Sequence, residues 1–369
     1  MVAERVSVTA KGRRALVWVL VLLLVVLAGC SAQLHEPRVS PSPSDRSQEL
    51  GAAIDAYVAE RQYGASRAIL VSHRGRLVAE RYYGSHVDDH VEVRSVTKSV
   101  MATLVGAALR EGRLPSIDAT LGELLPQYRS IMDARTERIT VRQLLTQTAG
   151  YTDKQTDDID PHRPVVPQLL KPGPQNPPGV GFEYQDGGPH LLSAVIAEVT
   201  GQTTLDYARQ VLFEPLDIQT RPAYQGSLFD VDKPEVEKIK TFGWLRDHEG
   251  IHCGSFGLRL TGRDLVKLGE LYRQGGVYNG RRILEESFVS EATRAQSGDL
   301  PGFDYGYLWW VTPIGTTPAY SAIGLYGQLV VVVPGRELVV AISNGSFPPA
   351  PSPEGQLLMV ETDILPRLP

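Results

Sequence analysis

Residues 93–101 read VRSVTKSVM and are the most informative stretch of the sequence. Ser95 and Lys98 are three residues apart, so a helix places their side chains on one face, one turn from each other. A serine hydroxyl is a poor nucleophile unless a neighbour takes its proton, and a lysine does so once desolvation has lowered its pKa. Residues 99–112 are nearly all apolar or small, which predicts a buried helix that desolvates Lys98. A capping serine followed by a surface lysine is the alternative interpretation.

Strand signals lie at both ends of the chain, and helical signals lie between them. The runs 68–72 and 76–82 flank His73-Arg74-Gly75, a pattern typical of a hairpin, and residues 48–63 have helical spacing. From about residue 95 to 271 helical signals dominate, with an irregular Asp- and Pro-rich loop at 151–181. Strand signals return at 305–311, 319–323, 328–333 and 337–343, with a turn at Pro334-Gly335.

This order predicts an α+β fold (an α/β sandwich). The N- and C-terminal strands are expected to form one antiparallel sheet flanked by helices. A mainly helical lobe, roughly residues 105–255, is expected as an insertion. A cleft between sheet and lobe is where a ligand site tends to form.

The composition is that of a globular protein. The chain has 369 residues, of which 42% are hydrophobic and 21% charged, so a wholly disordered chain is excluded. The formal net charge of −5 argues against nucleic acid as the main partner, because phosphate binding needs a concentrated basic surface. Two cysteines, Cys30 and Cys253, are too few for a disulfide scaffold or a Cys-rich metal site.

The N-terminus predicts export. A basic segment precedes the apolar run 15–28, which spans about 21 Å as a helix and so is shorter than a membrane core, as in a secretory signal. The sequence LAGC ending at Cys30 resembles the lipobox of bacterial lipoproteins. This implies a signal peptide at 1–29, lipidation of Cys30 and an exported lipoprotein anchored to the membrane and facing outside the cytoplasm. A plain signal peptide or an uncleaved anchor is the alternative.

Residues 30–47 are rich in Pro and Ser and predict a tether that holds the domain at 48–369 away from the membrane.

Several spaced elements together resemble the serine β-lactamase and penicillin-binding-protein family, in its class C branch. The first is the Ser95–Lys98 motif, and the others follow in the family's order over about residues 48–368. They are LLTQTAG at 144–150, the Tyr184-Gln185-Asp186 element, GLRLT at 257–261 and GYLWW at 306–310. The resemblance implies a β-lactamase/transpeptidase-like fold, acyl transfer at a serine, and neither metal nor cofactor.

The resemblance implies that Tyr184 is the family's catalytic tyrosine, with its phenol beside Ser95 and Lys98. A nearby cation lowers the pKa of a tyrosine from about 10, so the phenol can relay a proton to the leaving group. The third position of this element is Asp186, where the family has Asn. A carboxylate there offers only acceptors and would raise the pKa of Lys98. We expect either that Asp186 points away or that Tyr184 carries the proton while Lys98 gives electrostatic support.

The third family element, Lys-Thr-Gly on a strand, aligns by order with Leu325, Tyr326 and Gly327. The missing lysine weakens recognition of an anionic substrate by about 1–3 kcal/mol. The backbone N–H groups of Ser95 and Gln328 are predicted to form an oxyanion hole, and Gly327 to let substrate approach the strand. A plain hairpin strand is the alternative for this segment.

We therefore expect a serine hydrolase that cleaves an ester or amide bond of a small-molecule or peptide substrate through an acyl-enzyme. A true β-lactamase or a D-Ala-D-Ala carboxypeptidase is the alternative within the family. A non-catalytic envelope ligand-binding protein on the same fold is the alternative from another class, and it would form no covalent serine adduct. The oligomeric state stays open.

Two clusters with potential metal ligands are interpreted as loops. His248 and His252 precede Cys253, but Gly250 disfavours a helix that would bring the two rings together. The Asp-rich residues 153–160 lack the EF-hand spacing. Cys253 is expected to be a buried thiol, and Trp309 and Trp310 to face the core and the cleft wall.

Overall fold

The computed structural model describes residues 43–61, 66–300, 302–345 and 352–369, which belong to one compact unit. The predicted signal peptide, Cys30 and most of the predicted tether lie outside the described residues. Within the described part of the chain, none of the helices combines the length and apolar character that crossing a membrane requires.

The bounds of the elements are as follows. The α-helices are α1 (Pro43–Arg61), α2 (Val96–Arg110), α3 (Leu121–Leu124), α4 (Ala134–Glu137), α5 (Val141–Leu145), α6 (Asp153–Asp157), α7 (Val165–Leu170), α8 (Gly187–Thr200), α9 (Thr204–Ala208), α10 (Pro234–Glu237), α11 (Gly262–Arg273), α12 (Glu286–Ala292) and α13 (Pro353–Met359). The strands are β1 (Ser66–His73), β2 (Arg76–Tyr82), β3 (Val91–Glu92), β4 (Gly243–Trp244), β5 (Leu258–Leu260), β6 (Val277–Tyr278), β7 (Arg281–Arg282), β8 (Ser297–Leu300), β9 (Phe303–Tyr305), β10 (Trp310–Val311), β11 (Tyr320–Gly324), β12 (Gln328–Val333) and β13 (Leu338–Asn344).

Strands from the two ends of the chain form one antiparallel sheet. Among the described residues its order is β2-β1-β13-β12-β11-β10-β9-β8. N-terminal β1 pairs with C-terminal β13 from Ser66 opposite Asn344 to His73 opposite Leu338. A small separate sheet, β3-β5-β4, lies next to the segment that carries Ser95. The prediction of an antiparallel sheet built from both termini and flanked by helices is confirmed.

Strand β12 explains why helices cover both faces of the sheet. Val330 and Val332 belong to the hydrophobic cluster that includes α2 and α11. Leu329, Val331 and Val333 belong to a second cluster, which includes α1 and α13. Successive side chains of a strand point to opposite faces, so an unbroken apolar run is stable only when both faces are covered.

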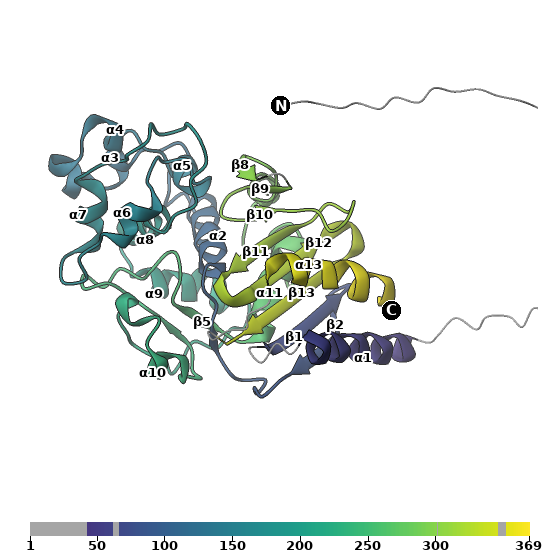
Figure 1. Cartoon of the computed structure of the whole chain (residues 1–369). Coiled ribbons are helices and arrows are strands. Elements are labelled where there is room, and N and C mark those ends of the chain that lie inside the picture. Colours follow the sequence, from purple (N-terminus) through teal and green to yellow (C-terminus); the bar gives the residue numbers. More distant parts are fainter. Residues whose placement is uncertain (1–42, 62–65, 301, 346–351) are drawn as a thin grey trace, which may run out of the picture. The chain divides into compact units, whose positions relative to one another are not determined.

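Helix α2 stands between the sheet and the helical lobe (Figure 1). It contacts β11 on the sheet side and α8 on the lobe side, and its residues 96–108 are buried. One hydrophobic cluster continues from the sheet through α2 into the lobe. Ser95, which caps the N-terminal end of α2, therefore lies at the junction between sheet and lobe.

Three local predictions need correction. Residues 151–181 are not wholly irregular, because they contain α6 and α7, and α7 buries apolar side chains against the lobe. Helix α1 begins at Pro43, inside the predicted tether, where a proline and an acidic residue in the first turn favour a helix start. The predicted strand 305–311 is divided into β9 and β10, since Leu308 adopts a φ of +56°.

Candidate active site

Ser95 and Lys98 meet at the start of α2. Ser95 precedes the first helical residue, and Lys98 lies in the first turn. The Nζ atom of Lys98 donates a hydrogen bond of 3.0 Å to Ser95 Oγ. Ser95 is half-buried, whereas Lys98 is only 1% exposed. The hydroxyl is thus accessible, and its partner amine is held inside the protein.

Oxygen atoms of Ser95, Asp186 and Ser255 accept hydrogen bonds from the Lys98 ammonium. Asp186 Oδ1 lies 2.5 Å from Nζ, and the backbone oxygen of Ser255 lies 3.4 Å away, in addition to Ser95 Oγ. Burial lowers the pKa of Lys98, but the Asp186 carboxylate and the Tyr184 phenol outweigh burial and raise that pKa above its usual range. Asp186 does not point away, so the structure favours the second of the two expected arrangements, in which Lys98 gives electrostatic support.

Tyr184 lies over the same ammonium group. The Nζ atom of Lys98 is 4.7 Å from the centroid of the Tyr184 ring. The ring stacks on Trp310 at 5.4 Å and meets Tyr305 edge-on at 6.1 Å. Trp310 is half-buried and its neighbour Trp309 fully buried, so the predicted division between cleft wall and core is confirmed. The structure thus brings Ser95, Lys98, Tyr184 and Asp186 into one site.

A buried pair of glutamines positions the Tyr184 element. Gln185 donates from Nε2 to Gln147 Oε1 at 2.8 Å, and Gln147 donates from Nε2 to the Gln185 carbonyl at 3.0 Å. Gln147 adopts a φ of +57°, and its carbonyl accepts from the Glu183 N–H at 2.9 Å. Sequence reasoning placed the Tyr184 element at the site and used residues 144–150 only as a family motif, so it did not foresee that these two side chains join the two segments.

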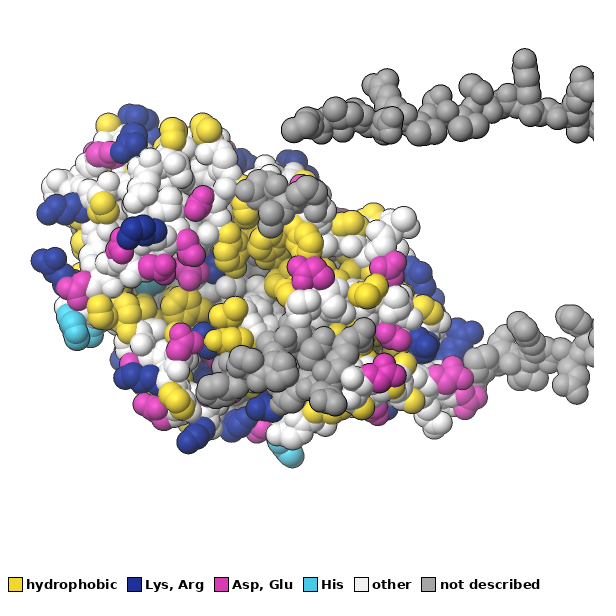
Figure 2. Space-filling view, viewed as in Figure 1, with side chains coloured by type: hydrophobic (Ala, Val, Ile, Leu, Met, Phe, Trp, Pro, Cys, Tyr) yellow, Lys and Arg dark blue, Asp and Glu magenta, His cyan; other side chains and the backbone are white. Residues whose placement is uncertain are grey.

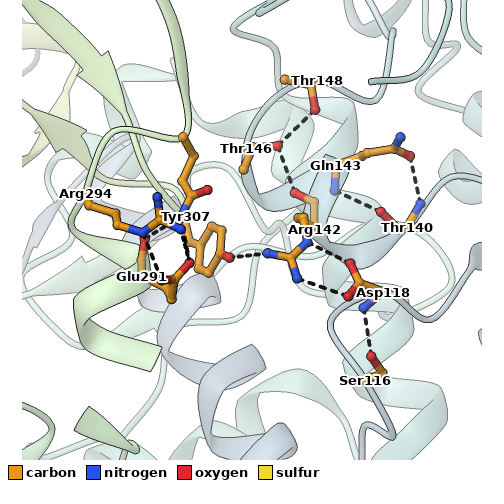
Figure 3. A network of polar contacts seen from close by, with 11 residues as sticks. Ser116, Asp118, Thr140, Arg142, Gln143, Thr146, Thr148, Glu291, Arg294 and Tyr307 are labelled. Carbon is orange, nitrogen blue, oxygen red and sulfur yellow. Dashed lines mark hydrogen bonds and ion pairs between the residues drawn. The ribbon is translucent and has the colours of Figure 1, made fainter. Parts of the chain in front are cut away.

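A polar network behind this pair fixes the segment 144–150 (Figure 3). At its centre, Arg142 of α5 binds both carboxylate oxygens of Asp118 at 2.7 and 3.0 Å and donates to the Tyr307 hydroxyl at 2.6 Å. Thr146 Oγ1 donates to the Arg142 carbonyl at 2.9 Å and contacts Thr148 Oγ1 at 2.9 Å. Two-point guanidinium–carboxylate contacts restrict geometry, so this network holds the helical lobe against the strand region that carries Tyr307.

Comparison with known proteins is consistent with this geometry. The Beta-lactamase family model matches residues 51–363. The chain belongs to this family. It is a serine hydrolase related to the β-lactamases.

Its relatives are distant. The 6-aminohexanoate-dimer hydrolase of Paenarthrobacter ureafaciens is 22% identical over 363 residues, covering 90% of this chain and 85% of the relative. Penicillin-binding protein 4 of Amycolatopsis lactamdurans is 26% identical over 316 residues, covering 80% of this chain and 81% of the relative. A solved class C β-lactamase superimposes with a TM-score of 0.67 at 16% identity, covering 89% of this chain and 99% of that structure. The last comparison shows the shared fold.

The glycine that approaches the Ser95 segment is Gly324, three residues before Gly327, the glycine that the sequence predicted for the third element. Gly324 packs against the segment before Ser95 so closely that a Cβ atom there would lie 2.7 Å from the Val93 carbonyl oxygen. Gly327 and Gln328 instead contact other elements: the Gly327 carbonyl accepts from Asn344 Nδ2 at 2.6 Å, and Gln328 Nε2 donates to the Asn344 carbonyl at 2.7 Å. Leu325 and Tyr326 form the turn between Gly324 and these residues, and Leu325 is 59% exposed.

Arg94 directly precedes Ser95 in the chain. It has a φ of +50° and is only 5% exposed. Its guanidinium contacts Glu92 at 2.5 Å and Asp232 at 2.9 Å, and it lies 4.9 Å from the centroid of the Tyr326 ring. Both neighbouring carboxylates neutralise this cation, so Arg94 does not replace the lysine that is missing from the third element.

Ser255 is a site residue that sequence reasoning missed. Its Oγ donates to the Asp186 carbonyl at 2.6 Å, while its own carbonyl accepts from Lys98. The preceding residue, Gly254, has no room for a side chain. A Cβ atom there would lie 1.9 Å from the carbonyl oxygen of Pro189, a residue in the first turn of α8. No local signal links Ser255 to the site, since it lies 69 residues after Asp186.

The segment with His248 and His252 forms a loop, as predicted. His248 is exposed and stacks on Phe229, whereas His252 is 4% exposed and contacts Trp244. Among the described residues, no group of three His, Cys, Asp or Glu side chains is arranged to hold a metal ion. Cys253 is a buried free thiol, as predicted.

We expect His252 to make the protein less stable in acid. Burial lowers the pKa of His252 to about 4, while the unfolded chain protonates this histidine near 6.5. The unfolded state therefore binds more protons between these values, and His252 costs roughly 3 kcal/mol of stability as the pH falls through this window. Urea unfolding between pH 7.5 and 4.5 should show that His252→Gln loses less free energy of unfolding with falling pH than the unchanged protein. The exposed control His248→Gln should keep the pH dependence of the unchanged protein. An equal pH dependence of the unfolding free energy in all three proteins would contradict the role of His252.

Proposed function

We propose that this chain cleaves an ester or amide bond through a covalent acyl-enzyme on Ser95. The observation that carries the proposal is the contact of Lys98 Nζ with Ser95 Oγ, in a site that also holds Tyr184 and Asp186. The relatives named 6-aminohexanoate-dimer hydrolase and penicillin-binding protein 4 support a substrate with an acyl group.

In the proposed acylation, Tyr184 acts as a phenolate, and its oxygen takes the proton of Ser95 as Oγ bonds to the carbonyl carbon. The bond to the leaving nitrogen or oxygen then breaks, and Tyr184 returns the proton to that atom. A water molecule repeats both steps and releases the acid and free Ser95. Lys98 stays charged throughout, because Asp186 stabilises its ammonium, and this charge lies 4.7 Å from the centre of the Tyr184 ring.

Two backbone N–H groups are proposed to bind the developing oxyanion. Among the described residues, the Ser95 N–H has no hydrogen-bond acceptor. The contact of Gly324 with the Ser95 segment favours the Leu325 N–H as the second donor, in place of the predicted Gln328. Backbone donors stabilise an oxyanion whatever their side chains are.

The charges of the site favour substrates without a carboxylate. A β-lactam or a D-Ala-D-Ala peptide carries an anion, which the family's third-element lysine helps to hold. Here that turn is Leu325-Tyr326, and the nearby cations Lys98 and Arg94 already contact carboxylates. A neutral ester or amide therefore fits better than the substrate of a β-lactamase or a carboxypeptidase.

A trapping experiment tests the proposed mechanism. The protein is incubated with p-nitrophenyl butyrate, quenched in acid and measured by intact mass spectrometry. We expect an added butyryl group, located on Ser95 by peptide mapping. A parallel panel compares this ester with a linear amide, a chromogenic cephalosporin and a D-Ala-D-Ala peptide. Hydrolysis without any Ser95 adduct, or an adduct on another residue, would overturn the mechanism, and preference for the last two substrates would favour the alternatives.

We expect Asp186→Asn to change pH dependence more than folding. Loss of the carboxylate lowers the pKa of Lys98, so Lys98 loses its charge at a lower pH and the alkaline decline of kcat/KM moves toward neutral. Asn keeps an acceptor oxygen for Nζ, so the cost in stability is about 1–2 kcal/mol. The pH profile of kcat/KM on matched ester and amide substrates measures the effect, with thermal unfolding as the control. Superimposable profiles would show that Asp186 does not act on the reaction.

A further inference from the structure

A cavity of about 300 Å³ lies beside β3 and β5, in the small sheet next to the Ser95 segment, and reaches the end of β13. This volume is at the lower end of the range for small-ligand pockets. The cavity has a buried polar floor and a more exposed basic rim. Its floor includes Glu92, Arg259 and Asn344, and its rim includes Arg67, Lys238 and Lys240.

Arg259 brings unpaired donors to the floor. It is only 2% exposed, and its Nη2 atom donates to the backbone carbonyls of His90 and Ile239. A guanidinium has five N–H donors, yet Nε and Nη1 have no hydrogen-bond partner among the described residues. Burial lowers the pKa of Arg259, and the carboxylates of Glu92 and Glu237 offset this effect only in part. An anion in the cavity would relieve the cost of this buried cation.

Asn344 brings an unpaired acceptor to the same floor. Its Nδ2 atom donates to the Gly327 carbonyl at 2.6 Å, and its backbone N–H and carbonyl pair with the Gln328 side chain at 3.1 and 2.7 Å. These contacts fix the buried side chain, and its Oδ1 atom has no donor within the described part of the chain. A ligand that satisfies both Arg259 and Asn344 therefore needs anionic oxygen atoms and a hydrogen-bond donor of its own.

Two carboxylates also line the cavity, and neighbouring cations offset their charge. Glu92 Oε1 accepts from the Arg94 N–H at 3.0 Å, and Glu92 Oε2 contacts the Arg94 guanidinium at 2.5 Å. Glu237 lies beside Arg67, since a Cβ atom at Gly345 would be 2.8 Å from Arg67 Nη2 and 3.2 Å from Glu237 Oε1. Neither carboxylate therefore cancels the charge of Arg259.

The lysines of the rim make the entrance positive. Lys238 is exposed and forms no ion pair with any described residue, whereas Lys240 Nζ lies 3.5 Å from Asp89 Oδ2. Figure 2 shows Lys and Arg side chains, with acidic ones among them, along the lower edge of the visible face, around the place that α10 has in Figure 1. The rim thus attracts an anion toward Arg259.

We propose that this cavity binds hydrogen phosphate. The anionic oxygen atoms suit the unpaired N–H groups of Arg259, and the P–OH group suits Oδ1 of Asn344. The site does not depend on the proposed acyl-enzyme, although Glu92 links it to Arg94, the residue before Ser95.

Two matched anions test the proposal with the full chain. Inorganic phosphate and sulfate are titrated by isothermal titration calorimetry at pH 8.0, where both are mainly tetrahedral dianions of similar size but only phosphate carries a proton. We expect one phosphate per chain, bound about five-fold more tightly than sulfate, because sulfate has no donor for Asn344. Thermal unfolding at rising anion concentration should give the same order. Absence of phosphate binding, or equal affinity for both anions, would overturn the proposal.

Two lysines near α10 provide a matched pair of variants. Lys238→Gln removes a charge at the rim and should weaken phosphate binding about three-fold, since an exposed charge is partly screened. Lys233→Gln removes the same charge from an exposed residue outside the cavity, which pairs with Asp230, and should keep the affinity. Arg259→Met should abolish binding. If that variant does not fold, the two lysine variants still decide. Equal effects of Lys238→Gln and Lys233→Gln, or unchanged affinity in folded Arg259→Met, would overturn the proposal.

The active site is the competing location for the anion. Phosphate bound beside Ser95 would compete with p-nitrophenyl butyrate, with an inhibition constant equal to its Kd from calorimetry, and that result would overturn the proposal. Binding with non-competitive inhibition, or with none, supports a separate site.

Discussion

Ser95→Ala should reduce kcat on any ester or amide substrate by at least about 1000-fold, because the proposed mechanism has no second nucleophile. The fold should persist. Ser95 is half-buried, and Lys98 keeps its contacts with Asp186 and the Ser255 carbonyl when the hydroxyl is removed. Steady-state kinetics and labelling with a fluorophosphonate probe measure the loss, and circular dichroism checks the fold.

Ser99 offers a control within the same helix. Its buried Oγ donates to the Leu308 carbonyl at 2.7 Å, so Ser99→Ala should cost about 1 kcal/mol of stability and keep turnover and labelling. Ser95→Ala with residual activity within ten-fold of the unchanged protein would refute the assignment of the nucleophile. A protein that never labels and never turns over would instead match the ligand-binding alternative on this fold.

Tyr184→Phe should lower kcat/KM by about 100- to 10,000-fold, the usual contribution of a positioned proton-transfer group. Phenylalanine keeps the ring that stacks on Trp310 and covers Lys98, so the substitution removes the proton carrier and little packing. Kinetics from pH 6 to pH 10 measure the effect. Tyr207→Phe is the control, since this tyrosine of α9 donates its hydroxyl to Glu111, at the opposite end of α2 from Ser95.

The outcome separates two roles for Lys98. If Tyr184→Phe kept more than a tenth of the activity, Lys98 would have to act as the base despite the raised pKa that Asp186 gives it. The proposed division of roles predicts that less than a tenth of the activity remains, because the Tyr184 phenol moves the proton and the Lys98 ammonium supplies only charge.

The sequence predicted most of the sheet because the relevant signals are local. The hairpin of β1 and β2 and the valine run of β12 are specified by alternation, turn residues and unbroken apolar runs. The single helical turn between Ser95 and Lys98 is equally local. The Tyr184 element was found through the order of spaced motifs and not through any property of the tyrosine alone.

What the sequence did not predict depends on contacts between distant segments. The charge of Lys98 depends on a carboxylate 88 residues away, and the placement of the third element depends on how closely Gly324 approaches the Val93 carbonyl. The third element was aligned by the order of the motifs, and the two glycines of this turn, Gly324 and Gly327, both fit that order. Neither the strength of the ion pair nor the position of the close approach is encoded in local periodicity.

The hydrophobic cluster that continues from the sheet through α2 into the lobe has a mechanical consequence for the enzyme. Separating the two halves as rigid bodies would expose apolar surface at about 2.5 kcal/mol per 100 Å², so hinge opening is too costly to admit a large substrate. We therefore expect the entrance beside Ser95 to keep a nearly constant width. Engineering for bulkier substrates should shorten side chains at the rim, because loosening the interior would unfold both halves together.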